Sequence, residues 1–273
     1  MAIGISLHVG LNTVDPNHYQ GWSGPLVACE ADAQDMSALA EASGFKTEIV
    51  LTKNATRSAI LNKISQAAGK CAAGDFFLLT NSSHGGQVPD LNSDEGDGAD
   101  ETICLYDGQL IDDELFMALS AFKAGVRVLV LSDSCHSGTM AKNTMVTAAM
   151  TDERRAVRYR AMPSEIMLRV YQANKSYYDP ILKRKDLAEA RQSAQASILL
   201  ISGCQDNQLS MDGPFNGAFT GALKQVWNGG LFKGGYHRFH KSIQDKLPNT
   251  QSPNLYWANN ADAKFLKQKP FTI

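Results

Sequence analysis

Two residues that act together in nucleophilic catalysis each follow a short apolar run. His84 stands in the segment NSSHGG after the apolar residues 76–80, and Cys135 stands in SDSCHSG after 126–131. A thiolate is a strong nucleophile, and a nearby imidazole lowers the pKa of the thiol and can later protonate a leaving amine. The pair predicts acyl transfer through sulfur if the fold brings the two side chains together.

Alternating apolar runs and helical periodicities indicate how the fold could do so. Period and composition predict strands over 3–9, 47–51, 76–80, 126–131, 197–202 and 255–257, and helices over 27–42, 56–68, 112–122 and 215–227. This repetition predicts an α/β fold with a mostly parallel central sheet and helices on both faces. Active sites in such sheets lie at the carboxyl ends of the strands, so His84 and Cys135 are expected to face one crevice.

Composition excludes several classes of protein. The chain has 273 residues, of which 44% are hydrophobic and 20% charged, as is typical of a globular protein. We expect a single domain over 1–273, with an insertion or lid at about 140–195. A net charge of -2 argues against nucleic-acid binding. No apolar run is long enough to span a membrane, and the N-terminus lacks the features of a signal peptide.

The cysteines and the charge blocks add two expectations. Five scattered cysteines are not a disulfide framework, which indicates the reducing cytoplasm. Residues 90–114 contain ten acids and no Lys or Arg, whereas residues 150–197 contain ten bases and six acids, a net of +4. Such blocks are usually solvated loops. No long exposed apolar stripe or heptad pattern is evident, so we expect a monomer.

The motifs around His84 and Cys135 resemble those of the caspase/metacaspase superfamily of cysteine peptidases, in particular metacaspases and their bacterial relatives, the orthocaspases. The segment DSCHSG is the strongest match, and the separation of 51 residues between His84 and Cys135 is close to the roughly 50 of caspases. Further matches occur at 28–33, 94–101, 111–115 and 201–208. The resemblance implies a caspase-like three-layer sandwich and a cysteine endopeptidase that works through an acyl-enzyme.

The resemblance also implies roles for single residues. Cys135 matches the nucleophile, His84 the general acid/base, and the backbone N–H groups of Gly85 and Cys135 the oxyanion hole. The pocket for the substrate residue before the cleaved bond, here called S1 for the pocket and P1 for the residue, matches Cys29, Asp32, Ser82 and Asp133.

Charge supports that pocket, because two carboxylates select Arg or Lys through charge-assisted hydrogen bonds. Cys29 and Asp32 are three residues apart on a predicted helix and can share a face. Cleavage is therefore expected after Arg or Lys and not after Asp. The simpler alternatives are a first-turn helix acid for Asp32 and a loop-capping acid for Asp133.

Metal binding is a separate question. Metacaspases that bind calcium use carboxylates of the acidic loop and the DDEL segment, which implies Asp97, Asp112 and Asp113 here. Lys142 stands where the family has a further Asp and would oppose a cation. We expect no required cofactor and keep calcium as an open alternative to a solvated acidic loop. Zinc bound by Cys135, His136, His84 and Cys204 lacks the usual ligand spacing.

The basic segment suggests self-cleavage. It contains Arg154, Arg155, Arg158, Arg160 and the basic run 183–185, in the region where caspase-type proteases are often processed. We hypothesise autoprocessing within 142–185, with a solvated helical lid as the alternative.

Two further functions stay open. Ser83 replaces the family's usual Gly, which leaves a catalytically weak or inactive peptide-binding or protein-binding domain as the alternative function, and a redox-sensing thiol as a third. The expected partners are peptide or protein substrates with a basic P1 residue, and neither nucleic acid nor membrane.

Overall fold

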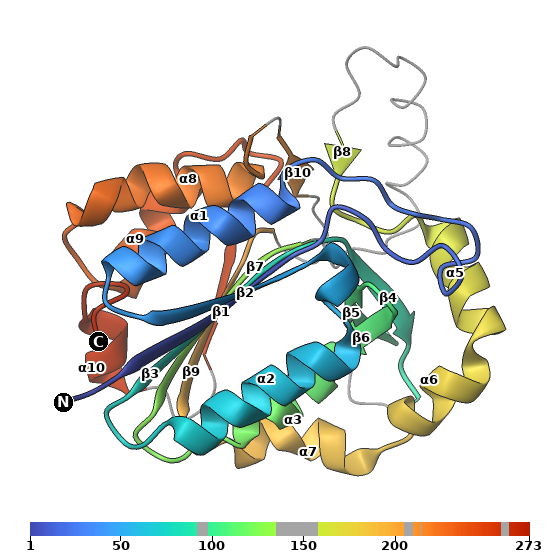
Figure 1. The fold of residues 1–273 in the computed structure, drawn as a ribbon, viewed down its shortest axis with the longest axis horizontal. Coiled ribbons are helices and arrows are strands. Elements are labelled where there is room, and N and C mark those ends of the chain that lie inside the picture. Colours follow the sequence, from blue (N-terminus) through green and yellow to red (C-terminus); the bar gives the residue numbers. More distant parts are fainter. Residues whose placement is uncertain (92–97, 135–157, 205–209, 214, 258–261) are drawn as a thin grey trace.

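A six-stranded sheet forms the centre of the molecule in the computed structural model, which describes the chain except residues 92–97, 135–157, 205–209, 214 and 258–261 (Figure 1). The strand order is β11-β9-β7-β3-β1-β2. The bounds are β1 (Gly4–Gly10), β2 (Lys46–Leu51), β3 (Phe76–Ser82), β7 (Arg127–Asp133), β9 (Ser197–Ser202) and β11 (Asn254–Trp257). All neighbours are parallel except β11, which is antiparallel to β9.

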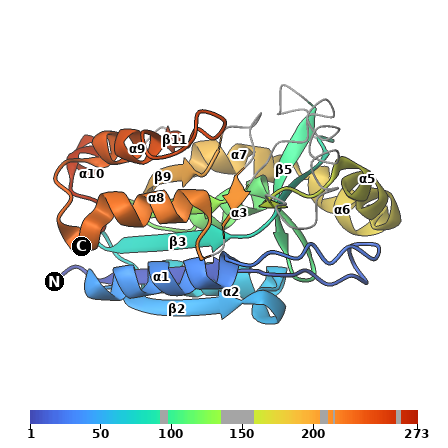
Figure 2. The same cartoon turned by 90° about the horizontal axis from the view of Figure 1, so that it is seen from above.

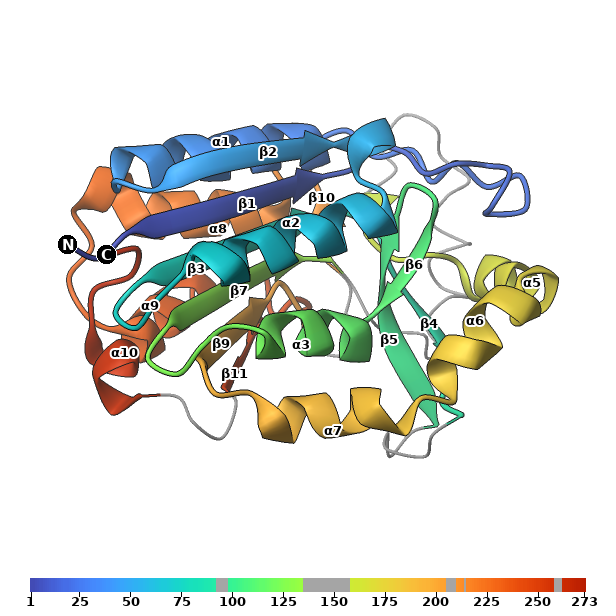
Figure 3. The same ribbon diagram turned by 60° about the horizontal axis from the view of Figure 1, so that its bottom comes forward.

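Helices cover both faces of this sheet, which confirms the predicted three-layer α/β architecture (Figures 1 and 3). One face carries α1 (Cys29–Ala42), α8 (Ala218–Trp227), α9 (Tyr236–Gln244) and α10 (Ala263–Lys267). The other carries α2 (Arg57–Lys70), α3 (Asp112–Ser120) and α7 (Lys185–Ser193). No helix among the described residues is long and apolar enough to cross a membrane.

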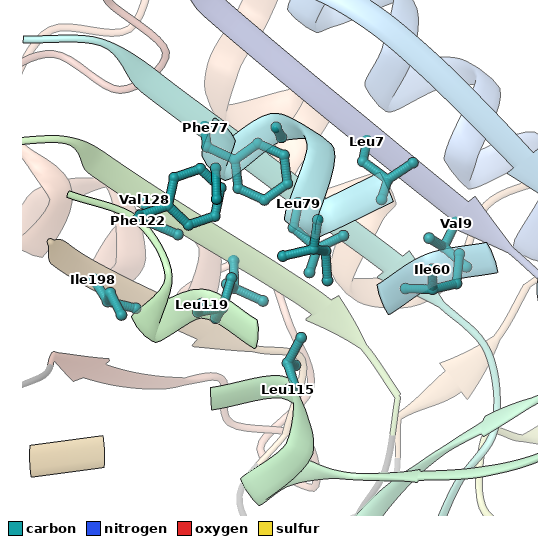
Figure 4. Packing of buried hydrophobic residues seen from close by; sticks show 14 of the residues in the cluster. Leu7, Val9, Ile60, Phe77, Leu79, Leu115, Leu119, Phe122, Val128 and Ile198 are labelled. Atoms are coloured by element: carbon teal, nitrogen blue, oxygen red, sulfur yellow. The ribbon is translucent and has the colours of Figure 1, made fainter. Parts of the chain in front are cut away.

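The central strands are apolar on both faces because each face packs against a helical layer. Phe77 and Leu79 of β3 point toward α2 and α3, where the Phe77 ring stacks on Phe122 with ring centroids 4.8 Å apart (Figure 4). The alternate residues Phe76 and Leu78 join the cluster beneath α1, α8 and α9. The same alternation determines toward which helical layer the side chains at the strand ends point.

Smaller elements gather beyond the carboxyl ends of the central strands (Figures 1 and 2). They comprise the antiparallel sheet β4 (Gly85–Pro89), β5 (Ala99–Leu105) and β6 (Gly108–Ile111), the pair β8 (Arg158–Tyr159) and β10 (Met211–Asp212), and the helices α5 (Ser164–Ala173) and α6 (Lys175–Leu182). Short 3-10 helices cover Thr52–Asn54 and Asn228–Gly230. None of the strands β4, β5, β6, β8 and β10 was predicted from the sequence.

Two predicted helices begin later than expected. The helix predicted from 27 starts at Cys29, and Val27 stands before it with 55% of its surface exposed. The helix predicted from 215 starts at Ala218, and Phe215 is 82% exposed. Both apolar residues continue the helical spacing in the sequence but make no part of the buried face.

A buried histidine in β1 makes the stability of the fold depend on pH. His8 Nδ1 lies 2.9 Å from Thr80 Oγ1, and its Nε2 lies 2.9 Å from Ser6 Oγ. Burial lowers the pKa of His8 from 6.5 to about 3, because desolvation disfavours the charged ring. Between these two values the unfolded chain binds more protons than the folded chain, so the free energy of unfolding falls as the pH falls.

We predict that His8→Asn weakens this acid dependence. The wild type should lose up to about 1.4 kcal/mol per pH unit from His8 below pH ~6.5, and the variant should lack that contribution. Urea unfolding of both proteins at pH 7, 6 and 5 measures the difference in slope. Identical slopes would mean that His8 is not kept neutral by the fold.

Candidate active site

The register of the parallel strands brings the predicted S1 residues together. Ser82 at the end of β3 lies opposite Asp133 at the end of β7. Both continue the strand face whose residues Leu78 and Leu131 pack beneath α1 and α8, so both side chains point toward that helical layer. Asp32, in the first turn of α1, accepts a hydrogen bond of 2.7 Å from Ser82 Oγ.

A guanidinium lies between the two carboxylates. Arg160, which follows β8 directly, has a side chain that is 0% exposed. Its Nη2 lies 2.7 Å from Asp32 Oδ2, its Nη1 lies 2.9 Å from Asp133 Oδ2, and Nη1 donates to Ser82 Oγ at 2.7 Å. Three of the predicted pocket residues therefore surround a basic side chain of the same chain. Arg160 belongs to the basic segment in which we expected self-cleavage, and its place in this pocket was not predicted from the sequence.

The fourth predicted residue, Cys29, is buried beside the same group. Burial raises the pKa of the Cys29 thiol to about 12, the positive charge of Arg160 opposes this shift, and a hydrogen bond with Ser82 opposes it further. The Cys29 thiol is therefore protonated at neutral pH and is no second nucleophile.

Backbone and side-chain donors hold the two carboxylates in place. Asp133 accepts from Ser210 Oγ at 2.7 Å through Oδ1, and from Thr220 N and Oγ1 at 3.0 and 2.8 Å through Oδ2. Asp32 Oδ1 accepts from Asn216 Nδ2 at 2.9 Å and from Gly217 N at 3.1 Å. Burial raises the pKa of Asp32, and the charge of Arg160 opposes that shift.

A third carboxylate contacts the same guanidinium and was missed from the sequence. Asp212 Oδ1 in β10 lies 3.0 Å from Arg160 Nη2, and the side chain is 0% exposed. Its other oxygen accepts from Val27 N at 2.8 Å. No local pattern in the sequence identifies this residue, because its partners lie far away along the chain.

The backbone around Arg160 runs through the site as an extended peptide. β8 is antiparallel to β10, and Arg160 N donates to Ser210 O at 3.0 Å. On the other side Gly85 N donates to Arg160 O at 2.9 Å, and Met162 N donates to Gly85 O at 2.8 Å. The N–H of Gly85, predicted for the oxyanion hole, thus binds the carbonyl of the residue whose side chain fills the predicted S1 pocket.

His84 is neutral, and one ring nitrogen keeps its lone pair. Nε2 lies 3.0 Å from Gly24 O, and since a carbonyl only accepts, Nε2 carries the hydrogen. Nδ1 has no hydrogen-bond partner among the described residues. Burial lowers the pKa of His84 to about 4, and hydrogen bonds from the ring to backbone carbonyls oppose this shift because they favour the protonated form. Nδ1 is therefore a base at neutral pH.

A glycine and a tryptophan hold this ring. The φ of Gly24 is +51°, and a Cβ there would lie 3.0 Å from His84 Cδ2 and 2.7 Å from the Trp22 ring. The rings of Trp22 and His84 have centroids 4.8 Å apart. The imidazole is thus oriented by a main-chain carbonyl and an aromatic contact.

Several predicted residues lie outside the described part of the chain. These are Cys135, Asp97 and Lys142. The described chain reaches Ser134, the residue after the end of β7, and the Oγ of Ser134 lies 2.8 Å from Ser132 Oγ. The pairing of Cys135 with His84 stays a prediction.

The calcium ligands stay a prediction as well. Asp112 and Asp113 begin α3. Within the described ranges, no three His, Cys, Asp or Glu side chains form a group that could hold a metal ion.

Comparison with known proteins gives one consistent picture. A family model described as "Caspase domain" matches residues 13–268. Metacaspase-1 of Cryptococcus neoformans var. neoformans is 28% identical over 96% of this chain and 64% of its own length, and Metacaspase-1 of Schizosaccharomyces pombe is 30% identical over 81% and 58%. The chain therefore spans less than two thirds of the length of these relatives.

Two solved structures are similar to this fold. Protein GSU0716 from Geobacter sulfurreducens has a TM-score of 0.87 and 52% identity, covering 99% of this chain and 98% of its own. Caspase-1 from Spodoptera frugiperda has a TM-score of 0.55 at 14% identity, covering 93% and 86%. The second likeness concerns the fold alone.

We predict that Arg160→Met destabilises the protein more at neutral than at acidic pH. The variant leaves Asp32, Asp133 and Asp212 buried without their shared cation, and removing one partner of a buried pair costs about 3–5 kcal/mol. Burial already raises the pKa of Asp32, and without Arg160 the opposing charge is lost, so the variant loses stability as the pH rises. Urea unfolding at pH 4.5 and pH 7, in a Cys135→Ala background that prevents self-cleavage, measures the loss.

Arg184→Met is the matched control. Arg184 pairs with Asp186 at the surface, where such a pair contributes at most about 1 kcal/mol. A loss for Arg160→Met no greater than for the control, or equal at both pH values, would contradict the assignment of a buried ion cluster.

Proposed function

The chain belongs to the caspase-domain family of cysteine peptidases, and we propose that it is an endopeptidase that cleaves after Arg or Lys through His84 and Cys135. The observation that carries this proposal is the guanidinium of Arg160, which is buried against Asp32, Ser82 and Asp133. A buried pocket with several carboxylates costs free energy unless a cation occupies it. A P1 side chain of Arg or Lys supplies that cation, whereas Asp would add charge of the same sign.

The proposed reaction uses Cys135 as the nucleophile and His84 as the general acid and base. The sulfur of Cys135 attacks the P1 carbonyl carbon, and His84 Nδ1 takes the thiol proton. The carbonyl oxygen becomes an oxyanion that Gly85 N–H stabilises. The C–N bond then breaks, and His84 returns the proton to the leaving amine nitrogen. Water attacks the thioester, with His84 again as the base, and releases the acid product and the thiol.

The position of Ser83 bears on the alternative of an inactive binding domain. Ser83 Oγ has two acceptors for its one proton, His84 O at 3.0 Å and Asn81 Oδ1 at 3.2 Å. Its φ is not positive, so a side chain at this position introduces no left-handed backbone. Serine in place of the family's glycine therefore fits the backbone at this position without distorting the site. We favour the active enzyme over the inactive binding domain.

One peptide bond within 142–185 fits the autoprocessing hypothesis. Arg160 fills the predicted S1 pocket with its side chain and binds Gly85 N–H with its carbonyl, as a P1 residue would. The bond after it, between Arg160 and Ala161, is therefore the bond that we propose for self-cleavage. Gly85 and Ala161 also form an isolated bridge, so the chain stays extended across this bond.

Peptide hydrolysis tests the proposed activity. Fluorogenic peptides that end in Arg, Lys or Asp are offered to the wild type, Cys135→Ala and His84→Ala, with calcium and with a chelator. We expect cleavage after Arg or Lys, none after Asp, loss of activity in Cys135→Ala, and a decrease of about 10²–10⁴-fold in kcat for His84→Ala. Cleavage confined to Asp, or activity that survives Cys135→Ala, would refute the proposal.

Intact mass and N-terminal sequencing test the cleavage site. We expect a wild-type fragment that begins at Ala161, and full-length chain for Cys135→Ala. Arg160→Gln should block this cut, whereas Arg169→Gln, an exposed arginine in the neighbouring α5, should not. An active wild type that stays full length, or a fragment that begins elsewhere, contradicts the assignment.

A further inference from the structure

We propose that Asp212 and Gly217 make the S1 pocket selective for arginine over lysine at P1. The inference rests on the proposed peptidase function and deepens it. The two-carboxylate pocket that the sequence predicts would accept either basic side chain. The described contacts of Arg160 add a third carboxylate and a flat wall, and both fit a guanidinium.

The acceptors in the pocket are divided between the two terminal nitrogens. Nη1 of Arg160 has Ser82 Oγ at 2.7 Å, Asp133 Oδ2 at 2.9 Å and Asp133 O at 3.2 Å. Nη2 has Asp32 Oδ2 at 2.7 Å and Asp212 Oδ1 at 3.0 Å. A planar guanidinium presents two such nitrogens in a fixed fork. The single nitrogen of a lysine cannot occupy both ends, so a P1 lysine leaves a buried carboxylate without its cation.

Asp212 is held in place by donors other than the guanidinium. Its Oδ2 accepts from Val27 N at 2.8 Å, and its Oδ1 accepts from Ala28 N at 3.4 Å, just before α1 begins at Cys29. β10 fixes the backbone of Asp212 through its pairing with β8. The carboxylate is thus preorganised at the Nη2 end, and a preorganised acceptor discriminates between ligands more strongly than a flexible one.

Gly217 supplies the space for the plane of the guanidinium. A Cβ at this position would lie 2.5 Å from Cζ, Nη1 and Nη2 of Arg160, far inside contact distance. The backbone itself does not require glycine, since φ is -60° and ψ is 154°. Gly217 N also donates to Asp32 Oδ1 at 3.1 Å, a bond that alanine would keep. Glycine at this position is therefore explained by the space that the guanidinium plane needs and not by the backbone conformation.

A pair of peptides that differ only in P1, Arg or Lys, tests the inference. We expect the wild type to prefer Arg by at least about 100-fold in kcat/KM, because a site built for hydrogen bonds rejects a ligand that lacks them. Asp212→Asn should reduce kcat/KM for Arg by about tenfold or more and change Lys by less than about threefold. Gly217→Ala should reduce cleavage after Arg by about 100-fold.

Matched controls separate these effects from general damage. Asp245→Asn removes a carboxylate that pairs with Lys241 at the surface. Gly221→Ala adds a Cβ in the same helix α8, where the nearest atom would lie at 3.7 Å. Both should leave both substrates unchanged. Inhibition by agmatine and by 1,5-diaminopentane gives a second measure without turnover, and Asp212→Asn should weaken inhibition by agmatine more.

The possible outcomes separate the proposed selectivity for arginine from the proposed peptidase activity. A wild type that cleaves after Lys as fast as after Arg, or an Asp212→Asn variant that loses both substrates equally, overturns the selectivity and leaves the peptidase standing. A Gly217→Ala variant with unchanged cleavage after Arg also overturns it. A wild type that cleaves neither peptide overturns both proposals.

Discussion

The buried ion cluster of Arg160 with Asp32, Asp133 and Asp212 is the interaction on which the rest of the site depends. The three carboxylates come from the first turn of α1, the end of β7 and the strand β10. A buried charge is stable only when it is paired with opposite charge and hydrogen-bonded. The cluster therefore fixes how these three elements meet, and it holds the extended segment around Arg160 beside His84 and Gly85.

The central sheet and three residues of the proposed pocket could be predicted from the sequence, and the structure shows the physical reason. Strands buried on both faces must be continuous apolar runs, so β3 and β7 were recognisable, and with them the chemistry at their ends. Ser82 and Asp133 follow from strand register, and Asp32 from its place at a helix start. These are local patterns with a fixed geometric consequence.

The remaining features have no such local pattern. Asp212 and Arg160 owe their roles to partners more than 25 residues away, and a single acid or base carries no periodicity. The small sheet β4-β5-β6 begins with two glycines and crosses the acidic loop, which hides the alternation that identifies strands. Val27 and Phe215 were wrongly included in the predicted helices. The helical spacing of apolar residues indicates residue type, whereas both side chains are exposed.

The occupant of the pocket and the pocket itself belong to one molecule. A ligand tethered in this way acts at an effective concentration in the millimolar range or above, whatever the concentration of the protein. Under the proposed function, a free peptide that makes the same contacts competes with Arg160 for the pocket and binds weakly until Arg160 leaves. Departure of Arg160 is also a first-order event within one chain, so its rate is the same in dilute and in concentrated solution. Under the proposed function, an unassisted release of Arg160 from the pocket therefore needs no encounter between two copies of the chain.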